Sequence, residues 1–145
     1  MKKIRFVSFL CILTVLCFSF SGCGGNKTVL NVYNVGDYID MDVIDIFEKE
    51  NPGIKVNYET FYANEEMYIK VANNSTAYDV IVPSDYMVER LISENLLLEL
   101  DKNNIPNMSN IGAQYLDHSY DKGNKYSVPY MWGTMGILYN KTMVD

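Results

Sequence analysis

Histidine and catalytic motifs are scarce in this chain of 145 residues, and these absences exclude several classes of function. His118 is the only histidine, so a histidine-rich metal site is excluded and a serine–histidine–aspartate triad has one candidate base. The stretch around it is polar and contains no strained nucleophile turn such as Gly-x-Ser-x-Gly, which favours a solvated loop histidine. A glycine-rich phosphate loop and metal-loop carboxylate spacing are also missing. We therefore expect a protein that is not an enzyme and that holds neither cofactor nor metal.

Positive charge is also scarce, and part of it lies at the very beginning of the chain. The sequence has 12 Lys and Arg residues against 18 Asp and Glu residues, and Lys2, Lys3 and Arg5 are among the 12. Without these three, nine basic residues oppose 18 acidic ones, which gives a formal charge of −9. An acidic body disfavours nucleic acid and anionic membrane surfaces as partners, and it suits a cationic ligand.

Residues 1–22 have the pattern of a secretory signal peptide. A basic start is followed by an apolar run at residues 6–20, which is too short and wrongly flanked for a stable membrane-spanning helix. The motif Phe20-Ser21-Gly22-Cys23 resembles a bacterial lipobox, although its first position is more often leucine. That resemblance implies that Cys23 becomes the lipidated N-terminus and that residues 23–28 form a tether. Ordinary signal cleavage and an uncleaved anchor are the alternatives.

The mature chain is expected to contain no internal disulfide. Cys11 and Cys17 lie in the removed segment, so Cys23 is the only cysteine that remains. The mature part is long enough for one small domain with a core, and it is rich in tyrosine, with 12 of these residues and a single tryptophan, Trp132.

Alternating strand and helix patterns indicate an α/β fold. Strands are expected at residues 29–33, 54–61 and 80–82, and helices at residues 41–50, 65–72 and 86–94. This order predicts a mainly parallel, doubly wound sheet with right-handed crossovers. The β-branched run from Val80 to Val82 predicts a strand that is buried on both faces. The polar pattern of residues 101–121 predicts a loop with short helical turns. Two further strands are expected at residues 126–130 and 136–140.

Turn and cap residues stand at the predicted boundaries. Gly36 is expected to supply the backbone freedom of the turn after the first strand. Asp40 and Asn64 are placed to cap the first two helices. Ser84 and Asp85 are good N-cap residues for the helix that follows the third strand.

Aromatic, acidic and hydroxyl side chains recur where the predicted strands end. Asp37 and Tyr38 follow the first strand, and Ser84, Asp85 and Tyr86 follow the third. The carboxyl ends of parallel strands share one edge of a sheet, and open α/β sheets bind ligands there. Aromatic faces attract ammonium groups, and carboxylates form charge-assisted hydrogen bonds with them, so this set suits a flexible organic cation. The alternative is that the tyrosines are half-buried packing residues and that Ser84 only caps a helix.

Several motifs together resemble the bacterial spermidine/putrescine-binding protein of polyamine ABC transporters. They are Leu30-Asn31-Val32-Tyr33-Asn34, Gly36-Asp37-Tyr38, the run from Tyr78 to Ser84, and the run from Tyr126 to Gly133. The likeness extends from about residue 29 to the end. It implies a type II periplasmic-binding-protein fold, in which two α/β lobes close over a ligand by hinge motion.

The resemblance also implies roles for individual residues. The matched ligand contacts of the first lobe are Tyr38, Ser84 and Tyr86, and the adjacent carboxylates that would add negative potential are Asp37 and Asp85. Val35 stands where the family has a tryptophan that forms an aromatic wall, which predicts an altered affinity. Tyr130 and Trp132 match the segment that leads into the hinge and are expected behind the direct contacts. Residues 29–133 would form the first lobe, and residues 134–145 would begin the hinge crossover.

The function expected from this resemblance is extracytoplasmic binding of putrescine or spermidine for an ABC importer, with permease and ATPase subunits as partners and a lipid anchor in the membrane. The family is about twice this length, so the chain is expected to be a fragment or a truncated gene product without the second lobe. One alternative is the same fold with Fe³⁺ or a sugar as ligand. Another is a ligand-free surface lipoprotein, and an enzyme would need His118 in a cleft beside a hydroxyl.

Overall fold

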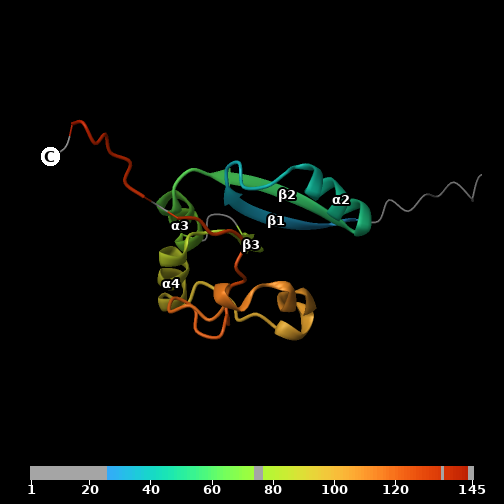
Figure 1. Cartoon of the computed structure of the whole chain (residues 1–145). Helices are drawn as coiled ribbons and strands as arrows, with labels where there is room; N and C mark the ends of the chain where they lie inside the picture. The colour runs from blue at the N-terminus through green and yellow to red at the C-terminus, as the bar shows by residue number, and fades with distance from the viewer. Residues whose placement is uncertain (1–25, 74–76, 135, 144–145) are drawn as a thin grey trace, which may run out of the picture.

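Three parallel strands, each followed by a helix, form the body of the molecule (Figure 1). The computed structural model describes residues 26–73, 77–134 and 136–143. The strands are β1 (Thr28–Val35), β2 (Ile54–Phe61) and β3 (Val80–Ile81), in the order β2-β1-β3. The helices are α2 (Asp42–Glu50), α3 (Asn64–Ala72) and α4 (Asp85–Ser93). The predicted parallel α/β fold and its order of elements are confirmed.

The remaining helical segments are short. They are 3₁₀ turns at Lys102–Asn104, Pro106–Asn110 and Ala113–Tyr115, as expected for a polar loop. In the described part of the chain, no helix is long and apolar enough to cross a membrane. The predicted signal peptide and Cys23 lie outside the described residues.

The register of the sheet brings the carboxyl ends of all three strands to one edge. Val35, the last residue of β1, pairs with Phe61, the last residue of β2. On the other side of β1, Tyr33 pairs with Ile81, and the N–H of Val82 donates to the Tyr33 carbonyl at 3.0 Å. The segments that leave the three strands therefore begin side by side, and we call this edge the rim.

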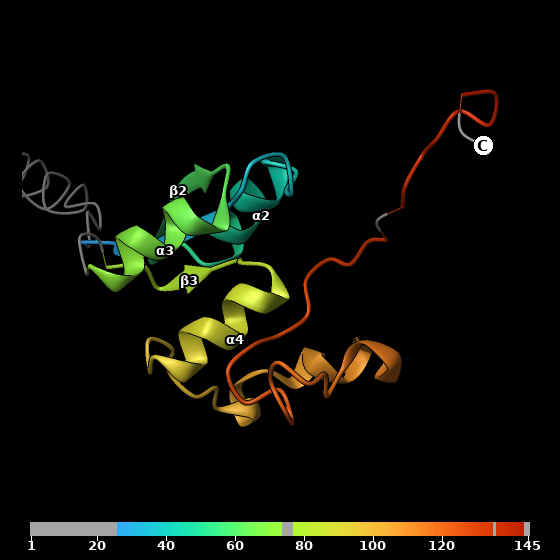
Figure 2. The same ribbon diagram turned by 90° about the vertical axis from the view of Figure 1, so that its left-hand side faces the viewer.

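The hydrophobic core lies between one face of the sheet and helices α3 and α4 (Figure 2). Its members, each at most 1% exposed, are Tyr33, Phe61, Met67, Met87 and Leu91. Tyr33 occupies the centre, because its ring meets Phe61 edge-on at 5.0 Å and stacks on Tyr78 at 4.5 Å. This core holds the starts of α3 and α4 at fixed positions beside the rim.

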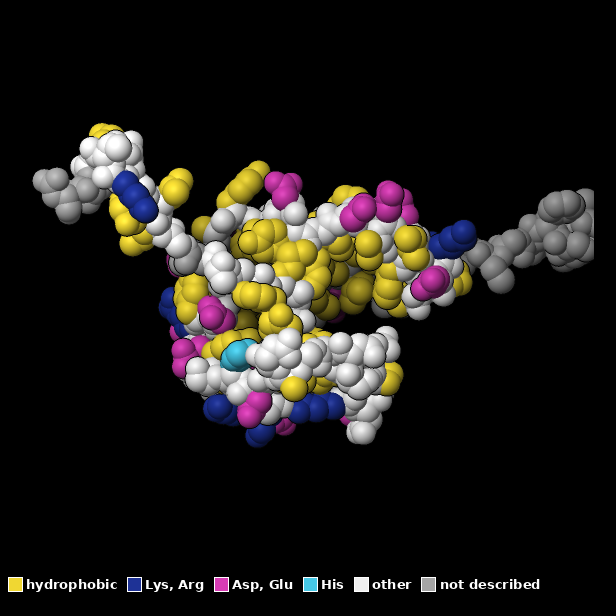
Figure 3. All heavy atoms as spheres, in the orientation of Figure 1, with side chains coloured by type: hydrophobic (Ala, Val, Ile, Leu, Met, Phe, Trp, Pro, Cys, Tyr) yellow, Lys and Arg dark blue, Asp and Glu magenta, His cyan; other side chains and the backbone are white. Residues whose placement is uncertain are grey.

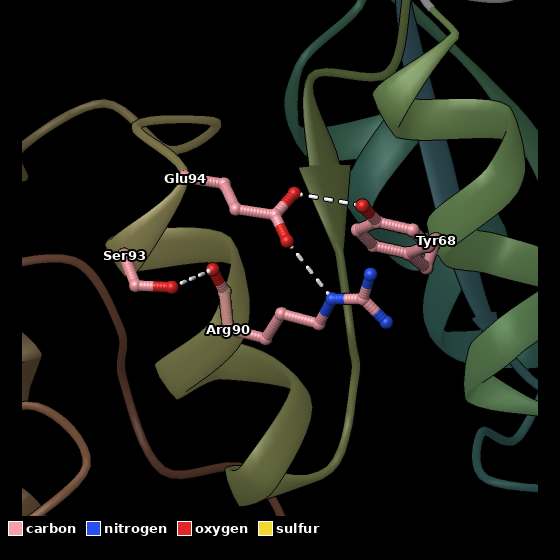
Figure 4. Close-up of polar contacts among 4 residues, drawn as sticks. All are labelled: Tyr68, Arg90, Ser93 and Glu94. Carbon is pink, nitrogen blue, oxygen red and sulfur yellow. Dashed lines mark hydrogen bonds and ion pairs between the residues drawn. The ribbon is translucent and has the colours of Figure 1, made fainter.

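A polar cluster also joins α3 to α4 (Figure 4). The Arg90 guanidinium lies 3.6 Å from the ring centroid of Tyr68 and donates from Nε to Glu94 at 2.9 Å. The Tyr68 hydroxyl donates to the other oxygen of the same carboxylate at 2.7 Å. These two donors, Arg90 foremost, hold the pKa of Glu94 below its ordinary value.

Replacing Glu94 by glutamine is expected to destabilise the chain at neutral pH and not in acid. A carboxyl whose pKa falls on folding contributes stability above its unfolded pKa and loses it as the pH drops through the folded pKa. In thermal melts from about pH 7 to about pH 3, the melting temperatures of Glu94→Gln and the unsubstituted chain should become equal as the pH falls. Glu89→Gln, at an exposed position of α4, is the control. A difference that stays constant with pH would contradict the argument.

The face of the sheet opposite the core is only partly covered. Helix α2 lies on this side, but none of its residues is buried, and Val43, Ile46 and Phe47 are 37–55% exposed. Ile81 of β3 packs on the core, so the alternating Val80 points to the other face, where it is 44% exposed. The prediction that this strand is buried on both faces is therefore wrong. Hydrophobic side chains gather over α2 and the sheet on this side (Figure 3).

The two strands predicted near the end of the sequence are not found in the described residues. In residues 126–130, the N–H groups of Tyr126 and Ser127 donate to the Asp121 carboxylate, so they are unavailable to a neighbouring strand. Residues 136–140 extend away from the body without a strand partner, and Leu138 is fully exposed (Figure 2). Both predictions are wrong because a suitable pattern forms a strand only where a partner edge is present.

Candidate functional site

The rim carries most of the residues that the sequence marks as ligand contacts. Ser84 and Asp85 begin α4, and Tyr86 is half exposed beside them. Ser84 has the extended backbone of an N-cap residue, but its hydroxyl makes no capping bond to the helix. The Ser84 side chain therefore does not cap α4 and is directed to another partner.

That partner is the first residue of α3. The Oδ1 atom of Asn64 accepts the N–H of Ser84 at 3.0 Å, and its Nδ2 atom donates to Ser84 Oγ at 3.0 Å. The next residue, Glu65, accepts the hydroxyl hydrogen of Tyr86 at 3.1 Å. Asn64 was predicted as the cap of α3, yet Ala63 takes that position and Asn64 makes no capping bond. The sequence marked both residues only as a helix start, because their partners lie about 20 residues further on.

The pKa of Tyr86 is raised. Burial is the largest cause, and the hydrogen bond to the Glu65 carboxylate and the nearby Asp85 charge act in the same direction. Tyr86 therefore keeps its hydrogen at neutral pH, and its half-exposed ring stands beside two carboxylates. A protonated phenol next to negative charge is suited to receive a cation.

The segment after β1 forms the second part of the rim. Asp37, not Gly36, adopts the left-handed conformation of this turn, with a φ of 61°. Aspartate tolerates this region because its short polar side chain can bond locally. The carbonyl of Tyr38 accepts a hydrogen bond from the Tyr130 hydroxyl, which fixes the chain around Tyr38. The ring of Tyr38 remains 45% exposed, as a contact surface requires.

A shallow pocket of about 250 Å³ lies next to this turn. It is lined by Gly36, Asp37, Ile39, Met41, Tyr58, Thr60 and Tyr62. Burial raises the pKa of Tyr58, so its phenol also stays protonated. One carboxylate, two tyrosines and a threonine hydroxyl give this pocket the same cation-binding character as the start of α4.

Other residues singled out in the sequence lie apart from this site. Val35 packs against the core cluster, so it provides no exposed wall at the rim. Trp132 is 68% exposed and meets Tyr115 at 5.5 Å. His118 is exposed and stacks on Tyr120, in agreement with a solvated loop histidine. Within residues 26–73, 77–134 and 136–143, no group of His, Cys, Asp and Glu side chains could hold a metal ion.

The fold is that of a solute-binding protein. The chain belongs to the family of bacterial extracellular solute-binding proteins, whose profile matches residues 34–145. It is 44% identical over 116 residues to the putrescine/cadaverine-binding protein of Pseudomonas aeruginosa, covering 80% of this chain and 32% of that protein. It is 37% identical over 121 residues to the spermidine/putrescine-binding periplasmic protein of Escherichia coli, covering 83% and 34%.

Solved structures agree with this assignment. The spermidine/putrescine ABC transporter substrate-binding protein PotD of Streptococcus pneumoniae superposes with a TM-score of 0.74 at 49% identity, over 82% of this chain and 36% of that one. The Tp0655 lipoprotein of Treponema pallidum gives a TM-score of 0.66 at 33% identity, over 71% and 32%. The resemblance and fold class predicted from the motifs are confirmed. The chain spans about a third of the length of these relatives.

Proposed function

We propose that residues 29–133 form the first lobe of an extracytoplasmic polyamine-binding protein that serves an ABC importer. The observation that carries this proposal is the rim, where half-exposed Tyr38 and Tyr86 stand among the carboxylates of Asp37, Glu65 and Asp85. The names of the relatives, which bind putrescine, cadaverine or spermidine, support the same ligand class. In this proposal, residues 134–145 begin the hinge, and permease and ATPase subunits are the partners in transport.

The chemistry of the rim fits a polyamine in two ways. The aromatic faces of Tyr38 and Tyr86 can pack against methylene groups and attract ammonium groups at the same time. The carboxylates add negative potential, and Ser84 keeps one free acceptor site for an N–H group. The protein therefore recognises the spacing of charge along a flexible chain, and the energy for transport comes from the ATPase subunits.

Specific observations weaken the alternatives. Tyrosinate ligation of Fe³⁺ would require Tyr86 to give up the hydrogen that its phenol donates to Glu65. A sugar carries no charge to match the acidic rim. A ligand-free surface lipoprotein would show an apolar patch without a polar pocket, but here the patch over α2 is accompanied by the pocket beside Asp37. An enzymatic role for His118 would need a cleft, but this side chain is exposed and its ring stacks on Tyr120.

Residues 24–145 are expected to bind putrescine no more tightly than about millimolar, or about 4 kcal/mol. Ligand pockets bury roughly 70–90% of a small ligand, whereas this rim is an open wall with half-exposed tyrosines. Immobilising the ligand costs at least several kcal/mol of free energy, which offsets most of the interaction energy that such a wall provides. NMR titration with putrescine at fixed ionic strength would measure the dissociation constant.

A paired substitution locates the binding. Tyr86→Ala should weaken it by about 0.5–1 kcal/mol, the scale of a cation–aromatic contact at an exposed site. Tyr139→Ala, at an exposed position outside the rim, should leave it unchanged. Micromolar affinity would mean that one wall suffices, and equal binding by the two variants would place the site elsewhere.

We further propose that the mature protein is anchored by lipid on Cys23, because the motif that ends in this cysteine resembles a lipobox and glycines follow it. Intact-mass analysis of the protein extracted from its native host should show a modified N-terminal cysteine. Cys23→Ser should shift the protein from the membrane fraction to the soluble fraction, because the acyl chains supply the anchoring energy. An unmodified N-terminus, or cleavage elsewhere, would refute the anchor.

A further inference from the structure

The beginning of α3 holds two of the polar side chains that the beginning of α4 offers to a ligand. Asn64 bonds to Ser84, and the neighbouring Glu65 bonds to Tyr86. Most side-chain hydrogen bonds in proteins go to backbone or water, so two adjacent residues that each bond to a side chain at the proposed site form an unusual arrangement. This arrangement determines which hydrogen-bonding roles remain open to a ligand.

The geometry fixes the orientation of the Asn64 amide. The backbone N–H of Ser84 can only donate, so the atom that receives it at 3.0 Å is the amide oxygen. The amide nitrogen must then face Ser84 Oγ, to which it donates at 3.0 Å. This bond occupies one acceptor site of the hydroxyl and sets its position, and it leaves a second acceptor site and one hydrogen.

The phenol of Tyr86 has a more restricted role. It carries a single hydrogen, which goes to Glu65 Oε1, so only lone pairs of its oxygen remain for a ligand. An ammonium group donates and never accepts, and it therefore matches this oxygen. The carboxylate also polarises the O–H bond, which strengthens a second hydrogen bond accepted by the same oxygen.

We propose that Glu65 is a specificity-determining residue that makes Tyr86 an obligate acceptor beside a carboxylate, while Asn64 holds Ser84 beside it. A neutral hydroxyl group can also donate to this oxygen, but an ammonium group forms the stronger, charge-assisted hydrogen bond, so the arrangement favours the ammonium group. This inference rests on the proposed polyamine-binding function. It assigns Asn64 and Glu65 the role of positioning Ser84 and Tyr86, which contact the ligand. The raised pKa of Tyr86 agrees with it, since Glu65 and the adjacent Asp85 both favour the protonated phenol, although the Asn64 amide acts in the opposite direction.

The first test measures the contact itself, without a ligand. Glu65→Gln and the control Glu66→Gln each remove one charge from the first turn of α3, but only Glu65 contacts Tyr86. Spectrophotometric titration of tyrosine, with the Tyr86→Phe counterpart of each protein subtracted, isolates the Tyr86 phenol. We expect its pKa to fall in Glu65→Gln and to stay unchanged in Glu66→Gln. The same pKa in both variants would overturn the role of Glu65.

The second test measures selectivity. NMR titrations with putrescine and with the neutral diol of the same chain length are compared at fixed ionic strength. Glu65→Gln should weaken putrescine binding about fivefold, the scale of one hydrogen bond, and weaken binding of the diol by less, whereas Glu66→Gln should change neither. Equal weakening of both ligands would overturn the selectivity. Absence of putrescine binding to the unsubstituted chain would instead contradict the proposed function, and the pKa measurement would still report on the Glu65 contact.

Discussion

An Asp121→Ala variant is expected to lose about 3–5 kcal/mol of unfolding free energy, the range for leaving several buried donors without a partner. Asp121 is 3% exposed, and its carboxylate accepts four hydrogen bonds. The donors are the backbone N–H groups of Lys125, Tyr126 and Ser127 and the hydroxyl of Ser127. Alanine removes every one of these acceptors at once. Urea denaturation followed by circular dichroism measures the loss.

The matched control is Asp45→Asn, which changes an exposed carboxylate of α2 and should alter stability by less than about 0.5 kcal/mol. Asp121→Asn offers a finer test and should cost less than alanine. Its amide oxygen can replace the oxygen that accepts three of the bonds, so that only the Lys125 N–H faces the amide group. If Asp121→Ala is as stable as the unsubstituted chain, the hydrogen bonds to the Asp121 carboxylate do not hold residues 121–127 together.

A Leu91→Ala variant is expected to lose about 2–5 kcal/mol, the range for a leucine removed from a packed core. Leu91 is fully buried in the core cluster between the sheet and the two helices beside it. Two contributions add up to this loss. The removed methyl groups no longer contribute the free energy of their transfer out of water, and the cavity that remains loses packing contacts. Because this core positions the starts of α3 and α4, the variant should also weaken the contacts at the rim.

Leu98→Ala is the control for this prediction, since it makes the same chemical change at a side chain that is 90% exposed. We expect it to change the unfolding free energy by less than about 0.5 kcal/mol. Urea denaturation of the two variants gives the comparison directly. Similar losses in both would mean that Leu91 does not sit in the centre of a cooperative core.

The regular elements of the body could be predicted from the sequence because local signals determine them. The apolar spacing of residues 41–50 and the alternation of residues 54–61 gave boundaries within one residue of α2 and β2. The failures concern properties that depend on distant neighbours. The pattern of residues 136–140 is strand-like, but pairing needs a partner edge, and the exposure of Val80 depends on which helices cover the sheet.

The candidate site divides in the same way. Tyr38 and Tyr86 could be placed at one edge because parallel strands align their ends. The partners of Ser84 and Tyr86 could not be predicted, since Asn64 and Glu65 have a complete local explanation as the beginning of a helix. The only local signal was the choice of residue types, and aspartate or serine would have served the helix equally well.

The central place of β1 in the sheet has a consequence for the order in which the protein can fold. Of the three strands, β1 is synthesised first. Its partner on one edge, β2, begins at Ile54, and its partner on the other edge, β3, begins at Val80. One edge of β1 therefore stays open until residues 54–61 have been made, and the other edge stays open until residues 80–81 follow. In such non-local pairings, the entropy of closing the loop is lost before the contacts between the strands can stabilise them. The sheet can therefore form in two stages, in which β2 pairs with one edge of β1 and β3 closes the other edge only after residues 80–81 have been made.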